Sequence, residues 1–249
     1  MMTRRFIFIF VILFGSICQI EAQDREPIRI LFVGNSYTAG IKRSFLEMVE
    51  ASLHSDAVVE TITPGGKTLA FHLENPETVK RIQDGDWDYV VLQDQSQTPA
   101  VFPKMFQEAA RDLDKIIDSS GAMTVFYMTW GRRDGDKQNA ERFPTYEKMQ
   151  KALTDSYASS ARRAKARIAP VGEAWRAVRM ADPSLGEELY KKDGSHPDSK
   201  GAYLAAAVFY STIFGDDPID VSFDGGLSAS ERKTILGAVA EATATYSNK

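Results

Sequence analysis

The sequence predicts an α/β protein with a five-stranded parallel sheet that is covered by helices on both faces, giving three α/β/α layers. Short apolar runs alternate with helical patterns, and this alternation is typical of parallel strands joined by helical crossovers. The runs contain few polar positions, as expected for strands that are buried on both faces. They span residues 28–33, 57–62, 87–92, 123–128 and 168–171.

Apolar residues recur at helical spacing in the stretches between and after these runs. The first stripe ends at Leu53, and two further helices are expected at the end of the chain. No internal repeat, and no linker rich in Pro, Gly or Ser, divides the pattern, so we expect one domain over residues 23–249. The expected helices cover residues 41–53, 106–117, 146–161, 199–214 and 228–246.

Residues 1–22 have the layout of a secretory signal peptide. Arg4 and Arg5 precede an unbroken apolar or small run over residues 6–18, and small residues near Ala22 resemble a cleavage site. The run is shorter than the roughly 20 residues that span a bilayer. We therefore expect a secreted or periplasmic protein, without stable membrane insertion once the segment is removed. Whether the segment is cleaved or kept as an anchor stays open.

Composition excludes several classes of partner and cofactor. The formal net charge of −4 and the absence of a basic patch argue against a nucleic-acid partner. Cleavage after Ala22 would remove Cys18, the only cysteine, so no disulfide or thiolate metal site is expected. With three histidines in the whole chain, we predict no metal and no cofactor. The oligomeric state stays open.

Polar residues follow the predicted strands, where ligands bind in such sheets. Ser36 lies in the turn after the first strand and becomes a nucleophile if a base reaches it. His196 is the predicted base. Asp193, three residues earlier, is close enough to accept from the imidazole and to orient it. Alone, each of these residues is more often a turn or cap residue, but together they predict nucleophilic catalysis.

Three donors are predicted to stabilise an oxyanion. They are the backbone N–H groups of Ser36 and Gly66 and the side-chain amide of Gln95, which follows the third strand. The competing interpretation is that Asp94 or Gln97 faces the site and Gln95 only braces its loop. In that case the two backbone donors act alone.

Four residues near these turns are predicted to line the substrate site: Tyr37, Gly65, His72 and Trp130. For His72 the alternative is a structural or rim histidine. For Trp130, which precedes Arg132 and Arg133, the alternatives are a stacking platform and a residue at the edge of the core.

Several of these blocks resemble those of the SGNH hydrolase superfamily, which contains the GDSL-like esterases and lipases. The matching blocks are Gly34-Asn35-Ser36, Gly66-Lys67-Thr68 and Asp193-Gly194-Ser195-His196-Pro197. The resemblance covers about residues 28–215 and implies a flavodoxin-like fold with Ser36 as nucleophile. Asn35 stands where the superfamily usually has Asp, which indicates a branch with Gly-Asn-Ser in place of Gly-Asp-Ser. Gln93-Asp94-Gln95-Ser96 replaces its Gly-x-Asn-Asp block, so Gln95 takes the place of the Asn.

The sequence therefore predicts a secreted serine esterase that uses Ser36, His196 and Asp193 and forms an acyl-enzyme. Short acyl esters are the expected substrates, with an acetyl ester on a carbohydrate as the first choice. Two alternatives stay open: a non-catalytic carbohydrate-binding module on the same fold, and an acyltransferase that uses the same triad. Turnover of a simple acetyl ester separates the binding module from the enzymes, and an alcohol acceptor separates transferase from hydrolase.

Overall fold

A five-stranded parallel sheet forms the centre of the protein, which we describe from a computed structural model for residues 26–247. The strand order is β2-β1-β3-β4-β5, and every neighbouring pair is parallel. This confirms the predicted three-layer α/β/α fold. The predicted signal peptide lies outside the described residues. The strands are β1 (Arg29–Val33), β2 (Val58–Ile62), β3 (Tyr89–Leu92), β4 (Met123–Tyr127) and β5 (Arg167–Ala169).

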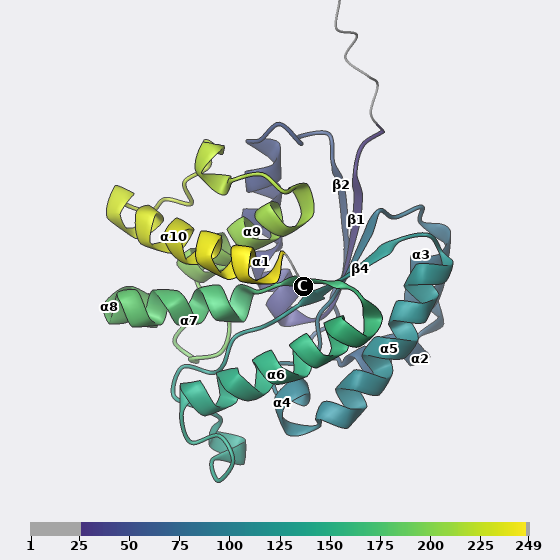
Figure 1. The fold of residues 1–249 in the computed structure, drawn as a ribbon, viewed down its shortest axis with the longest axis horizontal. Helices are drawn as coiled ribbons and strands as arrows, with labels where there is room; N and C mark the ends of the chain where they lie inside the picture. The colour runs from purple at the N-terminus through teal and green to yellow at the C-terminus, as the bar shows by residue number, and fades with distance from the viewer. Residues whose placement is uncertain (1–25, 248–249) are drawn as a thin grey trace, which may run out of the picture.

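Helices cover both faces of the sheet (Figure 1). One group packs against the face of β1 that carries Ile30 and Phe32, and the other against the face that carries Leu31 and Val33. The first group is α1 (Ser36–Glu50), α7 (Val171–Ala181), α9 (Ser199–Phe214) and α10 (Ala229–Tyr246), with α8 (Pro183–Glu188) beside α7. The second group is α2 (Leu69–Glu74), α3 (Pro76–Asp84), α5 (Pro103–Ser119) and α6 (Tyr146–Ala164), with the short α4 (Thr98–Val101) between α5 and α6.

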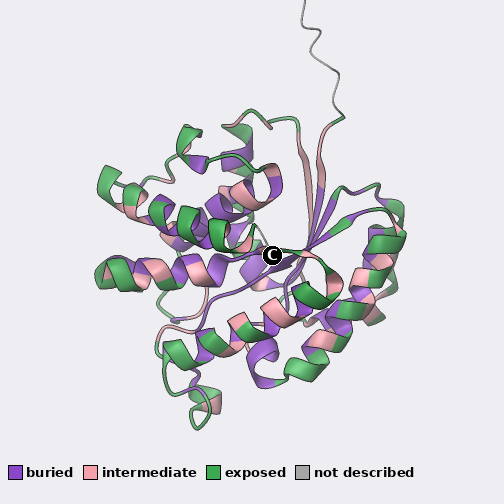
Figure 2. Ribbon diagram, in the orientation of Figure 1, coloured by how far each residue is buried: buried purple, intermediate pink, exposed green. Residues whose placement is uncertain are grey.

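The core lies in two layers on either side of the sheet, and buried residues line the inner faces of the helices (Figure 2). On the first face, Phe32 makes edge contacts with Phe45 of α1 and Phe209 of α9, at ring-centroid distances of 5.3 and 5.0 Å. Such aromatic contacts add to the free energy that burial of the rings already contributes. They fix α1, which begins at Ser36, against the centre of the sheet.

Three expectations about the elements were incomplete or wrong. The first helix begins at Ser36 and ends at Glu50, so Leu53 lies beyond it and is 93% exposed. The fifth strand ends at Ala169, because Pro170 is the N-cap of α7 and the chain turns into a helix there. The expected helices also omitted α2 and α3, between the second and third strands, α4 before α5, and α7 and α8 between the fifth strand and α9.

Candidate active site

The nucleophile turn, residues 34–36, connects β1 to α1. Asn35 caps α1, because its Oδ1 accepts from the Tyr37 N–H at 3.1 Å. The Ser36 N–H lies in the first turn of α1, where amides have no partner within the helix. It makes no hydrogen bond to any residue in the described part of the chain. The turn therefore presents both the Ser36 hydroxyl and a free amide.

Ser36, His196 and Asp193 form one hydrogen-bonded chain. Ser36 Oγ lies 2.9 Å from His196 Nε2, and His196 Nδ1 lies 2.7 Å from Asp193 Oδ2. Partial burial raises the pKa of the Asp193 carboxyl, but hydrogen bonds from the His196 side chain and backbone outweigh this and hold that pKa below its ordinary value. An ionised carboxylate only accepts, so His196 Nδ1 donates to Asp193, and Nε2 is the nitrogen left to accept from the Ser36 hydroxyl. This is the arrangement of a nucleophile, a base and an orienting acid.

The loop that carries His196 is anchored by residues of other elements. Trp130 Nε1–H donates to the Ser195 carbonyl at 2.9 Å, and the Arg133 N–H donates to the Gly194 carbonyl at 2.9 Å. The Tyr37 hydroxyl lies 2.7 Å from Ser195 Oγ. These contacts join the β4–α6 segment and the start of α1 to the loop, so the imidazole is held against the nucleophile turn.

The side chains of Tyr37, His72 and Trp130, which the sequence predicted to line the substrate site, are all buried. The Trp130 ring is stacked between Tyr37, at 4.7 Å, and Trp175, at 4.1 Å. Both faces of Trp130 are therefore covered by protein, and no sugar ring can stack on them. His72 has no exposed surface and contacts the nucleophile turn from within the protein.

Gly65 and Gly66 lie in the exposed loop between β2 and α2. Gly66 has φ +69°, which glycine adopts without strain, and its N–H makes no hydrogen bond to any described residue. Asn35 Nδ2 donates to the Lys67 carbonyl at 2.8 Å. This bond ties the Gly66 loop to the nucleophile turn, so two free backbone donors come from segments that touch.

Gln95 braces the loop after β3. Its Oε1 accepts from the Gln97 N–H at 2.7 Å and the Thr98 N–H at 3.3 Å, at the start of α4. Its Nε2 donates to Gln97 Oε1 at 3.3 Å, which leaves the second amide hydrogen for another acceptor. The bracing role that the sequence left open is thus present, together with one spare donor.

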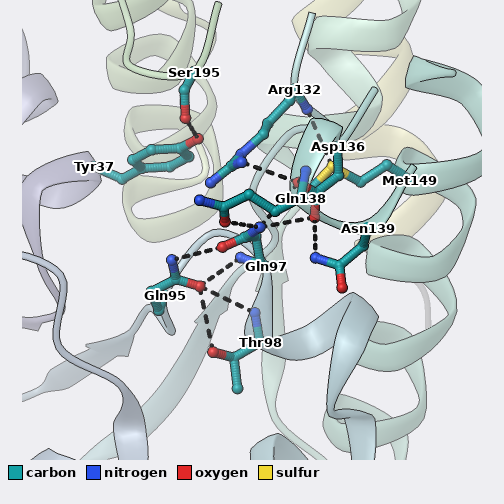
Figure 3. A network of polar contacts seen from close by, with 10 residues as sticks. All are labelled: Tyr37, Gln95, Gln97, Thr98, Arg132, Asp136, Gln138, Asn139, Met149 and Ser195. Atoms are coloured by element: carbon teal, nitrogen blue, oxygen red, sulfur yellow. Dashed lines mark hydrogen bonds and ion pairs between the residues drawn. The ribbon is translucent and has the colours of Figure 1, made fainter. Parts of the chain in front are cut away.

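A polar network behind Gln95 was not identified from the sequence (Figure 3). The buried Asp136 carboxylate accepts from Gln97 Nε2 at 2.8 Å, Arg132 Nη1 at 3.0 Å and Asn139 Nδ2 at 2.7 Å. Burial raises the pKa of Asp136, but these hydrogen bonds outweigh it, so the pKa lies below its ordinary value. The network links the β3–α4 loop to the β4–α6 segment.

Asp94, the residue before Gln95, is a buried carboxyl without an ionic partner among the described residues. Its Oδ1 accepts from the Gln95 N–H at 2.6 Å, whereas its Oδ2 has no hydrogen-bond partner in that part of the chain. Burial raises the pKa of Asp94 to about 7. The protonated form is therefore favoured by folding, and ionisation of Asp94 costs stability.

We predict that Asp94→Asn removes a pH-dependent cost of folding. The folded protein holds the Asp94 proton up to about pH 7, whereas an unfolded aspartate loses it near pH 4. Wild-type stability should therefore fall as the pH rises from about 4 to about 7, and Asp94→Asn should lack this component. By linkage the difference between pH 5 and pH 8 is roughly 2–3 kcal/mol.

Urea unfolding of both proteins at pH 5 and pH 8 measures this difference. Asp155→Asn, at an exposed position of α6, serves as the control and should follow the wild type. An equal pH dependence in wild type and Asp94→Asn would contradict the assignment of a protonated Asp94.

Residues 26–247 contain no group of three His, Cys, Asp or Glu side chains arranged to hold a metal ion. The same residues contain no helix with both the length and the apolar character needed to cross a bilayer.

Comparisons with known proteins agree with this fold. The model of a family described as "Domain of unknown function (DUF4886)" matches residues 75–244. A crystal structure of a DUF4886 family protein from Bacteroides uniformis has a TM-score of 0.76 at 18% identity, over 89% of this chain and 96% of that one. No curated protein sequence matches the chain.

Two further solved structures connect the fold to a candidate SGNH hydrolase and to an esterase. A protein from Slackia heliotrinireducens, described as a candidate SGNH hydrolase, has a TM-score of 0.65 at 29% identity, over 75% of this chain and 98% of that one. The acetyl xylan esterase AlAXEase has a TM-score of 0.58 at 12% identity, over 75% of this chain and 100% of that one. The fold is thus shared with SGNH hydrolases and esterases.

Proposed function

The chain belongs to the DUF4886 family, and from that starting point we propose that it is a serine esterase that hydrolyses carboxylic esters through an acyl-enzyme. One observation carries the proposal: the hydrogen-bonded chain from Ser36 through His196 to Asp193. The likeness of the fold to SGNH hydrolases and esterases supports it. A non-catalytic binding module has no need of this aligned chain.

In the proposed reaction, Ser36 Oγ attacks the ester carbonyl carbon while its proton passes to His196 Nε2. Asp193 keeps the other imidazole proton on Nδ1 and stabilises the imidazolium. His196 then gives the proton to the departing alcohol, which leaves an acyl group on Ser36. Water attacks that acyl group with His196 again as the base, and Ser36 is regenerated as the acid departs.

The tetrahedral intermediates carry a negative oxygen that needs donors. The N–H groups of Ser36 and Gly66 support this role, because neither bonds to another described residue and the two segments are joined through Asn35. The spare amide hydrogen of Gln95 is the proposed third donor. Donors that are held in place before the reaction stabilise the oxyanion without reorganisation.

For the substrate we propose a short acyl ester, with an acetyl group on a carbohydrate as the first choice. The triad is open to solvent, since the side chains of His196 and Asp193 are 38% and 49% exposed. An open site fits an ester that is attached to a large polar molecule. Residues 1–22 support export of the enzyme, to the periplasm or beyond the cell.

A substrate panel tests this choice. We expect faster turnover of acetylated xylooligosaccharides and p-nitrophenyl acetate than of p-nitrophenyl octanoate. Addition of an alcohol acceptor distinguishes the hydrolase from an acyltransferase, because a transferase would form a new ester in place of free acetate.

We predict that Ser36→Ala and His196→Ala each lower kcat on p-nitrophenyl acetate by roughly 10⁴–10⁶, because nucleophile and base act as a unit. The double variant should be little worse than either single one. Ser199→Ala removes an exposed hydroxyl near the same loop and is the matched control. Wild-type turnover by Ser36→Ala would exclude the proposed mechanism.

We predict that Asn35→Asp lowers kcat about tenfold, as expected for the loss of one hydrogen bond that holds a catalytic donor. A carboxylate cannot donate to the Lys67 carbonyl, so the Gly66 loop would lose its tie to the nucleophile turn. Lys67→Ala is the control, because it keeps that backbone carbonyl and should retain activity. If Asn35→Asp and Lys67→Ala have the same kcat, the tie does not serve the oxyanion.

We predict that Gln95→Glu separates the two roles of Gln95. Glutamate keeps an oxygen for the Gln97 and Thr98 N–H groups but lacks the amide donor. If Gln95 is an oxyanion donor, the Gln95→Glu enzyme should have a kcat about 10²–10³ lower than the wild type, with KM little altered. Gln95→Ala should lose kcat and also lower the melting temperature. A loss in Gln95→Glu below about fivefold would leave Gln95 as a brace only.

A further inference from the structure

The geometry points to His72 as a positioning residue that acts with Gln93 to fix the peptide between Gly34 and Asn35, directly before the nucleophile. This inference rests on the proposed esterase function. His72 touches neither substrate nor the reacting atoms, because it is fully buried. Its effect on catalysis passes through the backbone that carries Ser36.

His72, in the short helix α2, holds the carbonyl end of this peptide. His72 Nε2 lies 2.9 Å from the Gly34 carbonyl oxygen. A carbonyl only accepts, so Nε2 carries a proton. Burial lowers the pKa of His72, so the ring is neutral and Nδ1 accepts from the Thr78 hydroxyl at 3.2 Å. One ring orientation and one tautomer satisfy both contacts.

Gln93, which follows β3, holds the amide end of the same peptide. Its Oε1 accepts from the Asn35 N–H and from the Thr38 hydroxyl, both at 2.9 Å. Gln93 has no exposed surface, and its Nε2 donates to the Asp94 carbonyl, so its side chain is held in turn. The Gly34–Asn35 peptide is therefore held at its carbonyl by His72 and at its N–H by Gln93, which come from two different segments.

The space around the turn leaves little room for another arrangement. A Cβ at position 34 would lie 2.4 Å from Thr38 Oγ1 and 2.5 Å from Gln93 Oε1, so only glycine fits. If the Gly34 carbonyl lost its donor, it would be a buried acceptor without a partner. Rotation of the peptide toward another donor would then lower the free energy. Such a rotation would tilt Ser36 Oγ and the Ser36 N–H away from a substrate.

Loss of the His72 donor should affect the rate of the reaction and not the stability of the fold alone. A misplacement of the reacting groups by a fraction of an ångström mainly slows the chemical step, because positioning accounts for much of the lowered barrier. His72 has no exposed surface and therefore makes no direct contact with a bound substrate. Loss of the His72 donor should therefore lower kcat and leave KM nearly unchanged.

The test compares three variants with the wild type on p-nitrophenyl acetate. His72→Phe keeps the ring volume but removes the donor, and we expect kcat to fall about 10–100-fold with KM within about twofold. His72→Gln can place an amide N–H near the position of Nε2 and should recover most of the activity. Ile82→Ala, a buried change in α3 far from the turn in sequence, is the control for lost stability and should keep wild-type kcat at a temperature where it is folded.

A wild-type kcat in folded His72→Phe would overturn the positioning role, and so would an equal loss in His72→Gln and His72→Phe. A second measurement applies even if the wild type hydrolyses no ester, in which case the proposed function fails. Nitrogen NMR of the wild type should show His72 as the neutral Nε2–H tautomer, and the amide signals of Asn35 and Ser36 should move in His72→Phe and return in His72→Gln. Unmoved amide signals, or the other tautomer, would overturn the inference that His72 holds the Gly34–Asn35 peptide.

Discussion

The parallel register of three neighbouring strands, β2, β1 and β3, determines where three loops of the candidate site begin. Val33 of β1 is paired with Ile62 of β2 on one side and with Leu92 of β3 on the other. The ladder extends one step into the loops, since the Gly34 N–H donates to the Ile62 carbonyl and the Gln93 N–H to the Val33 carbonyl. The loops after β2, β1 and β3 therefore start side by side at the same edge of the sheet. The nucleophile turn, which follows β1, lies between the other two loops.

Neutral amide and imidazole groups satisfy the backbone around that turn. Asn35 accepts from the helix and donates to the Lys67 carbonyl, which requires both halves of an amide. Gln93 likewise accepts from the turn and donates to its own loop. A carboxylate at either position would accept only, and its charge would oppose the negative oxygen that forms in the proposed ester cleavage. The Asn at position 35 is thus consistent with the rest of the turn rather than an isolated departure from Gly-Asp-Ser.

Features with a repeating pattern along the chain could be predicted from the sequence. Prediction failed for residues whose burial depends on partners from distant segments. Alternating strands and long amphipathic helices carry their own periodicity. The polar residues after the first strand led to Ser36, and the Asp193–Pro197 block late in the chain led to His196. Helices α2 and α4 have six and four residues, too few for a period to be visible. His72 and Trp130 follow strands as site residues do, but contacts with Gly34, Tyr37 and Trp175 bury them. Only the folded chain brings those partners together.

The loop that carries Gln95 lies between two buried carboxyls with opposite effects on stability. The Asp136 carboxylate accepts from the Gln97 amide and from the Arg132 guanidinium. Such contacts hold its pKa below the ordinary value, so Asp136 stays ionised and fixes the Gln97 side chain. Asp94 has an oxygen without a partner among the described residues, and burial raises its pKa to about 7. A buried polar atom left unpaired destabilises the fold and is found most often where function requires a fixed geometry. As the pH rises through about 7, ionisation of Asp94 therefore costs stability at one end of this loop, whereas Asp136 at the other end keeps its hydrogen-bond donors.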